Sequence, residues 1–135
     1  MQPFDVQAIG IEAPFETVFT YVANPATLAE WTHALKSTGA GRARMETPDG
    51  AIDVGLRVES DRNSGVIDWI LQFPDDKLAR AEARVVRNGE RATIFTFVLH
   101  SPPVPQEQVQ GSLEQQKNIL RGELQKLKRR LERHA

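Results

Sequence analysis

Three segments in the middle of the chain, and a fourth less regularly, carry apolar residues at every second position, a pattern typical of a strand with one buried face. They span residues 52–58, 67–73, 79–85 and 93–99. Asn63-Ser64-Gly65 and Asn88-Gly89, which separate them, have the residue types that hairpin turns require. With a first strand at 4–11 and weaker strands near 34–37 and 41–46, we predict an antiparallel sheet of six or seven strands. One apolar face on each strand implies that only one side of the sheet is covered.

The cover is predicted to be a long C-terminal helix. No proline occurs between residues 106 and 134, and one stripe of residues in this segment recurs every three or four positions, as on one face of a helix. The stripe comprises Val109, Leu113, Gln116, Leu120, Leu124, Leu127 and Leu131. A helix of this length measures about 42 Å, which is enough to cross the whole sheet.

Two short helices are predicted after the first strand. Pro14 suits the first turn of a helix, and Phe15, Val18, Phe19 and Val22 form an apolar stripe on it. Asn24-Pro25 ends this helix and starts a second one over residues 25–31, which directs Leu28 and Trp31 to the same side. The predicted fold class is therefore α+β, organised as a single domain over residues 1–135.

Composition excludes several functions. Seventeen basic and eighteen acidic residues give a net charge of −1, so no global field attracts nucleic acid or an anionic membrane. Without cysteine there is no disulfide, thiolate metal site or cysteine nucleophile, and the three histidines are widely separated, so we expect neither metal nor cofactor. No apolar run approaches the ~18 residues of a membrane span, and the first residues do not resemble a leader, so we expect a cytoplasmic protein without stable membrane insertion.

The opening of the chain resembles a known family. Residues 9–19 read IGIEAPFETVF, and Leu28-Ala29-Glu30-Trp31 follows in the second helix. This pattern is similar to the START/Bet v 1-like (SRPBCC) superfamily, particularly to its small bacterial polyketide cyclase/dehydrase-like and lipid-transport-like members. The resemblance implies a helix-grip fold, in which a curved sheet wraps around the terminal helix. It also implies a cavity between the two that holds an apolar small molecule.

If the apolar strand faces look inward, they supply the wall of such a cavity. The expected ligand-binding residues are Trp31, Val54, Leu56, Trp69, Leu71, Ala81, Ala83, Phe95, Phe97, Gln116 and Leu120. The alanines would leave room opposite the helix, whereas the alternative is that the bulky side chains close the gap into a solid core. Gln116 could bond a ligand carbonyl or hydroxyl, or could lie where the helix overhangs the sheet.

The charged residues of the strands fall on the outward-facing positions, so we expect an inward face without charge, to which the strands supply no group for acid–base catalysis. We therefore predict the binding or carrying of an apolar or aromatic molecule such as a lipid, a quinone or a polyketide-like compound. One alternative is a cyclase or dehydratase in which His33 or Tyr21 moves protons. Another is a protein-interaction module that uses the basic helix end, and the leucines of this helix could also form a homodimer contact.

Overall fold

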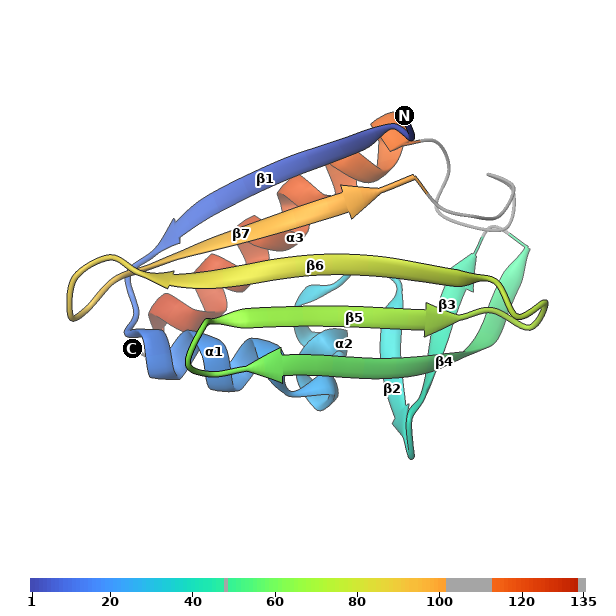
Figure 1. The fold of residues 1–135 in the computed structure, drawn as a ribbon, viewed down its shortest axis with the longest axis horizontal. Helices are drawn as coiled ribbons and strands as arrows, with labels where there is room; N and C mark the ends of the chain where they lie inside the picture. Colours follow the sequence, from blue (N-terminus) through green and yellow to red (C-terminus); the bar gives the residue numbers. More distant parts are fainter. Residues whose placement is uncertain (48, 102–112, 134–135) are drawn as a thin grey trace.

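The computed structural model describes residues 1–47, 49–101 and 113–133. In this part of the chain, seven strands form one antiparallel sheet with the order β1-β7-β6-β5-β4-β3-β2 (Figure 1). The strands are β1 (Phe4–Ile11), β2 (Leu35–Gly39), β3 (Arg42–Thr47), β4 (Gly50–Asp61), β5 (Val66–Gln72), β6 (Leu78–Arg87) and β7 (Thr93–His100). The prediction of six or seven antiparallel strands is therefore confirmed, with seven.

The helices are α1 (Phe15–Ala23), α2 (Leu28–Trp31) and α3 (Leu113–Arg133). The short helix predicted over residues 25–31 divides into a 3-10 turn at Pro25–Thr27 and one turn of α-helix. Asn24 starts the 3-10 turn, because its side-chain oxygen accepts the N–H of Ala26 at 3.0 Å. Of the predicted terminal helix, residues 106–112 and 134, with Val109 among them, lie outside the described residues.

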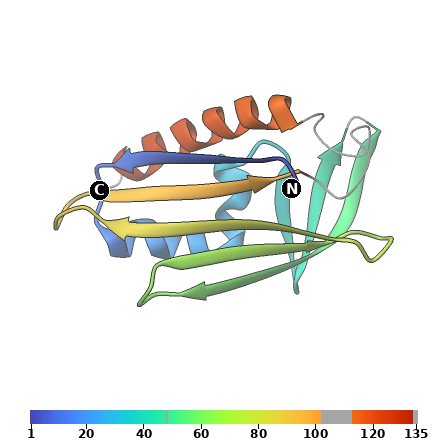
Figure 2. The same ribbon diagram turned by 45° about the horizontal axis from the view of Figure 1, so that its top comes forward.

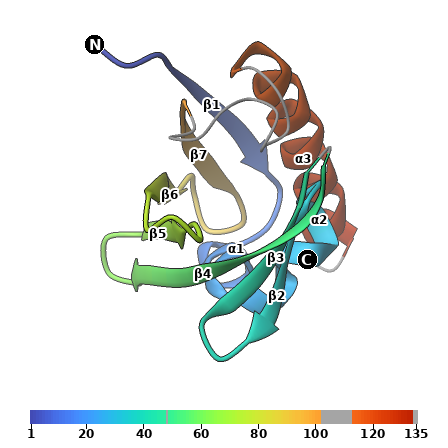
Figure 3. The ribbon, with the colours of Figure 1, turned by 90° about the vertical axis from the view of Figure 1, so that its right-hand side faces the viewer.

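The sheet is strongly bent, and all three helices lie on its concave side. Figure 2 shows α3 running along the sheet beside β1 and β7, and Figure 3 shows β2 and β3 curving round to close the far side. Of the two short helices, α2 contacts α3 and β2, and α1 contacts β6. This is the helix-grip arrangement expected from the sequence, and it is confirmed.

In each strand, the side chains at alternate positions that are mainly apolar lie on the concave face of the sheet. Trp69 of β5 is paired with Ala81 of β6, and Ala83 of β6 is paired with Phe97 of β7. The charged parity faces outward, where Asp53 and Glu59 of β4 are exposed. The predicted outward position therefore holds for Asp53 and Glu59, whereas Arg80 of β6, also predicted to face outward, lies beside the pocket described below.

One end of the concave side is a solid core. Its fully buried members include Val18 and Val22 of α1, Val85 of β6, Phe95 of β7 and Leu127 of α3. The one buried polar residue among the described ones is Thr93, and its hydroxyl donates to the carbonyl of Ala13 at 2.6 Å. This end of the molecule is thus close-packed and has its polar groups satisfied.

The leucine stripe of α3 is buried against the concave side of the sheet. Leu120, Leu124, Leu127 and Leu131 are all at most 3% exposed, so they contact the chain's own sheet and short helices and are not presented to a second copy. The end of α3 is also tied to the end of β1, where Lys128 Nζ donates to the carbonyl of Gly10 at 2.8 Å.

Candidate functional site

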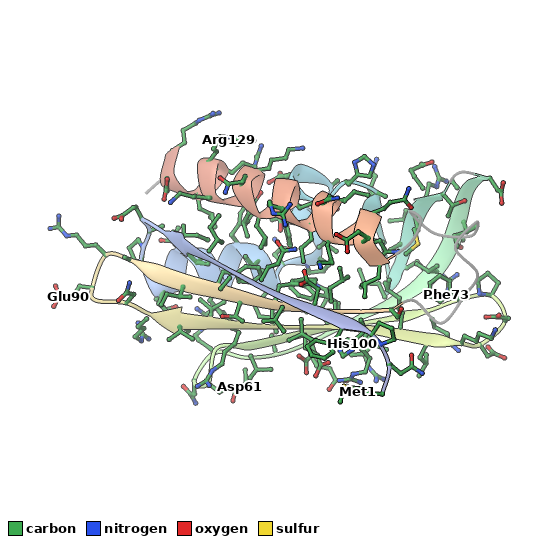
Figure 4. The ribbon with its side chains drawn as sticks, turned by 90° about the horizontal axis from the view of Figure 1, so that it is seen from above. Met1, Asp61, Phe73, Glu90, His100 and Arg129 are labelled. Atoms are coloured by element: carbon green, nitrogen blue, oxygen red, sulfur yellow. The ribbon has the colours of Figure 1, made fainter. Side chains whose placement is uncertain are left out.

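A pocket of about 710 Å³ lies between the sheet and the first half of α3. Its walls come from the ends of β5 and β7, the start of β6, the segment that follows α2, and residues 116–123 of α3. Figure 4 places Phe73 and His100, two of its lining residues, towards the end of the sheet at which α3 begins. The concave side is therefore solid at one end and hollow at the other.

Small side chains explain why this end is hollow. Ala79 and Ala81 of β6 and Ala34 before β2 line the pocket, and each presents only a methyl group to it. Further along β6, Val85 is buried in the solid core and restores the volume that the alanines lack. The alanine face proposed from the sequence to leave room does lie beside a pocket.

An aromatic cluster separates the pocket from the solid core. Trp31 contacts Trp69 edge-on, with ring centroids 6.5 Å apart, and it contacts Phe95 in the same way at 6.3 Å. Trp69 in turn lies against Phe97, with centroids 5.7 Å apart. Both tryptophans and Phe97 line the pocket, whereas Phe95 lies behind them. The rings give the pocket a rigid apolar wall.

The predicted ligand-binding residues divide into two groups. Those that line the pocket are Trp31, Trp69, Leu71, Ala81, Phe97, Gln116 and Leu120. Val54, Leu56, Ala83 and Phe95 share the concave face but are buried in the core, away from the pocket wall. Of the two alternatives for Gln116, its place in the pocket wall agrees with the first. That any of these residues binds a ligand remains a prediction.

The two candidate proton-transfer residues lie in different places. His33 lines the pocket directly after α2, and its side chain is exposed. Tyr21 is not part of the pocket wall, because its hydroxyl donates to Glu30 at 2.7 Å and accepts from Arg130 at 2.9 Å. Partial burial and the bond to Glu30 raise the pKa of Tyr21 to about 12. This tyrosine therefore ties α1, α2 and α3 together and stays protonated near neutral pH.

The expectation of an inward face without charge does not hold in the pocket, because the carboxyl-bearing Glu123 of α3 lies in its wall. One of its oxygens, Oε2, accepts the backbone N–H of His33 at 2.6 Å. Burial raises the pKa of this carboxyl to about 7, against the opposing effects of the His33 N–H and of Lys126. The sequence holds a signal for this position, since Glu123 follows Leu120 by three residues and Gln116 by seven, on the same helix face.

The other charged groups at the pocket have acidic partners of their own. Lys77 lies 3.7 Å from Asp75, and Arg80 lies 3.7 Å from Asp68. His100 Nε2 lies 2.6 Å from Glu82 Oε1. These pairs are at the rim, where the side chains are partly exposed. Lys77, Arg80 and His100 therefore mark the mouth of the pocket. The remaining polar residues of its lining are Gln2, Thr32, His33, Ser101, Gln116 and Glu123.

Nowhere in residues 1–47, 49–101 and 113–133 do three His, Asp or Glu side chains gather as a metal site requires. Among the three described helices, none has the length and the apolar content needed to cross a bilayer.

No protein-family model and no curated protein matches the sequence. Solved structures do match over nearly the whole chain. A START superfamily protein from Mycobacterium smegmatis is 15% identical with a TM-score of 0.66, and the match covers 98% of this chain and 99% of that one. A Deinococcus radiodurans protein is 20% identical with a TM-score of 0.68, over 99% and 100% of the two chains.

The Zhui aromatase/cyclase from Streptomyces sp. R1128 is 14% identical with a TM-score of 0.67, and the match covers 98% of this chain and 95% of that one. At these identities the likeness shows the fold and carries no function by itself. The chain has the START-like helix-grip fold, as its opening motif indicated.

Proposed function

We propose that this protein binds an apolar, ring-bearing small molecule in the pocket between its sheet and α3. The observation that carries the proposal is an apolar pocket of about 710 Å³ walled by Trp31, Trp69 and Phe97. Pockets for small molecules commonly measure about 300–1,000 Å³ and combine apolar walls with a few polar groups. Flat rings suit such a wall, because aromatic faces and edges stack favourably on one another.

Intrinsic fluorescence tests the proposal directly, because the only two tryptophans of the chain both line the pocket. A pyrene derivative absorbs where tryptophan emits, so its entry should quench the protein's emission in a saturable way. A thermal-shift panel of fatty acids, quinones and flavonoid-like molecules provides a second readout. A compound that binds only the folded state raises the melting temperature.

A matched pair of variants locates the binding. Ala81→Leu adds volume inside the pocket, whereas Ala8→Leu adds the same atoms to an exposed position on β1. We expect Ala81→Leu to weaken quenching by at least about tenfold and Ala8→Leu to leave it unchanged. Equal quenching in both variants would place the ligand elsewhere and contradict the proposal.

A second candidate is an enzyme of the cyclase or dehydratase type that acts on a polyketide-like substrate. Glu123 favours it, because a carboxyl with a pKa of about 7 can both take and give a proton near neutral pH. The shared fold of an aromatase/cyclase agrees with this candidate but does not carry it. With a substrate in hand, Glu123→Gln should lower kcat, whereas Tyr21→Phe, remote from the pocket, should not.

A further inference from the structure

Glu123 has one carboxylate oxygen left for a ligand. Oε2 is occupied by the backbone N–H of His33, at 2.6 Å. Among the described residues, Oε1 has no hydrogen-bond or ion-pair partner. A carboxylate has room for several donors, so one N–H leaves most of its capacity unused. In the wall of an apolar pocket, the unused oxygen can accept a hydrogen bond from a bound molecule. Such a bond orients the molecule, in addition to the fit of its shape to the wall.

Among the described residues, no cation forms an ion pair with this carboxylate, and Lys126 acts on it only through its charge. Lys77 and Arg80 line the pocket but lie next to Asp75 and Asp68, and His100 lies next to Glu82. His33 faces Glu123 through its backbone N–H. Lys126, on the same helix, is exposed.

A buried carboxylate without a cation is costly unless donors surround it. The chain supplies one donor and leaves the second place open, so a ligand that donates a hydrogen bond there is favoured over one that does not. A ligand that brings a carboxylate of its own would place two negative groups side by side, which is unfavourable.

We propose that the pocket selects apolar ring-bearing molecules that carry a hydrogen-bond donor, a hydroxyl or a protonated amine, which Glu123 Oε1 accepts. This inference rests on the binding function proposed above and narrows it. Phenolic compounds and apolar amines meet the requirement, whereas quinones lack a donor and fatty acids carry a carboxylate. Glu123 is thus a specificity-determining residue.

The test uses four pyrenes substituted at the same ring position: hydroxypyrene, aminomethylpyrene, methoxypyrene and pyrenecarboxylate. Their dissociation constants are measured by tryptophan quenching at about pH 8, where the Glu123 carboxyl is mostly ionised. Methoxypyrene is the matched control for hydroxypyrene, because it keeps the oxygen atom bonded to the ring and lacks the O–H donor. Comparing the amine compound with the hydroxyl compound shows which of these two donor groups Glu123 prefers.

In the wild-type protein we expect hydroxypyrene, aminomethylpyrene or both to bind at least about tenfold more tightly than methoxypyrene, as a hydrogen bond to a charged group allows. Pyrenecarboxylate should bind most weakly. Glu123→Met, of similar length and without charge, should bring the hydroxyl and methoxy compounds within about twofold of each other. Glu123→Gln provides a second variant and should lose the preference for the amine. Glu114→Gln, exposed on the same helix, should behave as the wild type.

The outcomes separate the two proposals. If all four pyrenes quench and methoxypyrene binds as tightly as the two donors, the donor preference is overturned while the binding function stands. If none of the four quenches, the binding function itself fails. A donor preference that survives in both Glu123 variants would overturn the role of Glu123 even though the pocket is occupied.

Discussion

At the scale of single residues, Glu123 departs most clearly from its surroundings. It lies on the face of α3 that otherwise presents Leu120 and Leu127, and its carboxyl is held against the segment that follows α2 by the N–H of His33. Desolvation favours the neutral acid and the N–H favours the carboxylate, and the resulting pKa of about 7 shows that desolvation is the larger effect. Ionisation of this residue should therefore affect the stability of the fold.

We predict that Glu123 makes the folded protein less stable as the pH rises from about 4.5 to about 7. The unfolded carboxyl titrates near 4.5 and the folded one near 7, so in this window the folded chain keeps a proton that the unfolded chain has released. The stabilisation is complete below the lower value and is lost as the pH passes the upper one. The unfolding free energy of Glu123→Gln minus that of the wild type should therefore increase by up to about 3 kcal/mol between pH ~4 and pH ~8.

Urea denaturation of both proteins across this range measures the difference, and subtracting one curve from the other removes the contributions of all other titrating groups. If the unfolding free energies of the two proteins change in parallel with pH, the Glu123 carboxyl titrates alike in the folded and unfolded chains, and the prediction is contradicted.

At the scale of elements, α3 packs differently at its two ends. Leu127 is fully buried in the solid core, whereas Leu120 lines the pocket. Truncation of Leu127 removes contacts on all sides, so Leu127→Ala should cost about 2–5 kcal/mol of unfolding free energy. Leu120→Ala should cost less, because the side chain borders the pocket and has fewer packed neighbours on that side to lose. Equal losses in chemical denaturation would indicate that α3 is packed alike along its length.

The turn that follows β4 requires a glycine at position 65. Gly65 has φ +79°, and a Cβ there would lie 2.1 Å from the carbonyl oxygen of Val85. The same close approach allows the Val85 N–H to donate to the Gly65 carbonyl at 2.8 Å, which joins this turn to β6. Gly65→Ala should therefore cost well over the ~1–2 kcal/mol of a left-handed backbone alone.

Gly89, with φ +86° and open space around it, is the matched control and should show only the backbone cost when replaced by alanine. Gly65 and Gly89 variants of similar stability would contradict the steric role assigned to Gly65.

The elements were predictable from local pattern, because a strand or helix with one buried face repeats its apolar residues at a fixed period. The contents of the pocket were only half predictable. Ala81 and Ala83 share one strand and one face, yet only Ala81 lines the pocket. The difference depends on where the helices cross the sheet, which is set by long-range packing. Strand alternation does not predict Glu123, because it identifies only the side chains of strands, and the spacing of the leucines predicts an apolar face for α3.

At the scale of the whole molecule, the two faces of the sheet differ in composition and in surroundings. The convex face carries the charged residues and is solvated, while the concave face holds a close-packed core at one end and an apolar pocket at the other. The solid end gives the fold its stability, and it leaves the pocket end free to keep empty space. A cavity in this position is the basis of both proposals made for the protein.

The most direct test of this account is an NMR titration with hydroxypyrene that follows the backbone amides and the two indole N–H groups. Both indoles belong to pocket residues, and neither indole nitrogen has a hydrogen-bond partner in the described part of the chain. The account predicts that the Trp31 and Trp69 indole signals and the Ala81 amide shift together and saturate, while the Val18 amide in the solid core stays in place. Unchanged indole signals, with shifts confined to residues of the convex face, would contradict it.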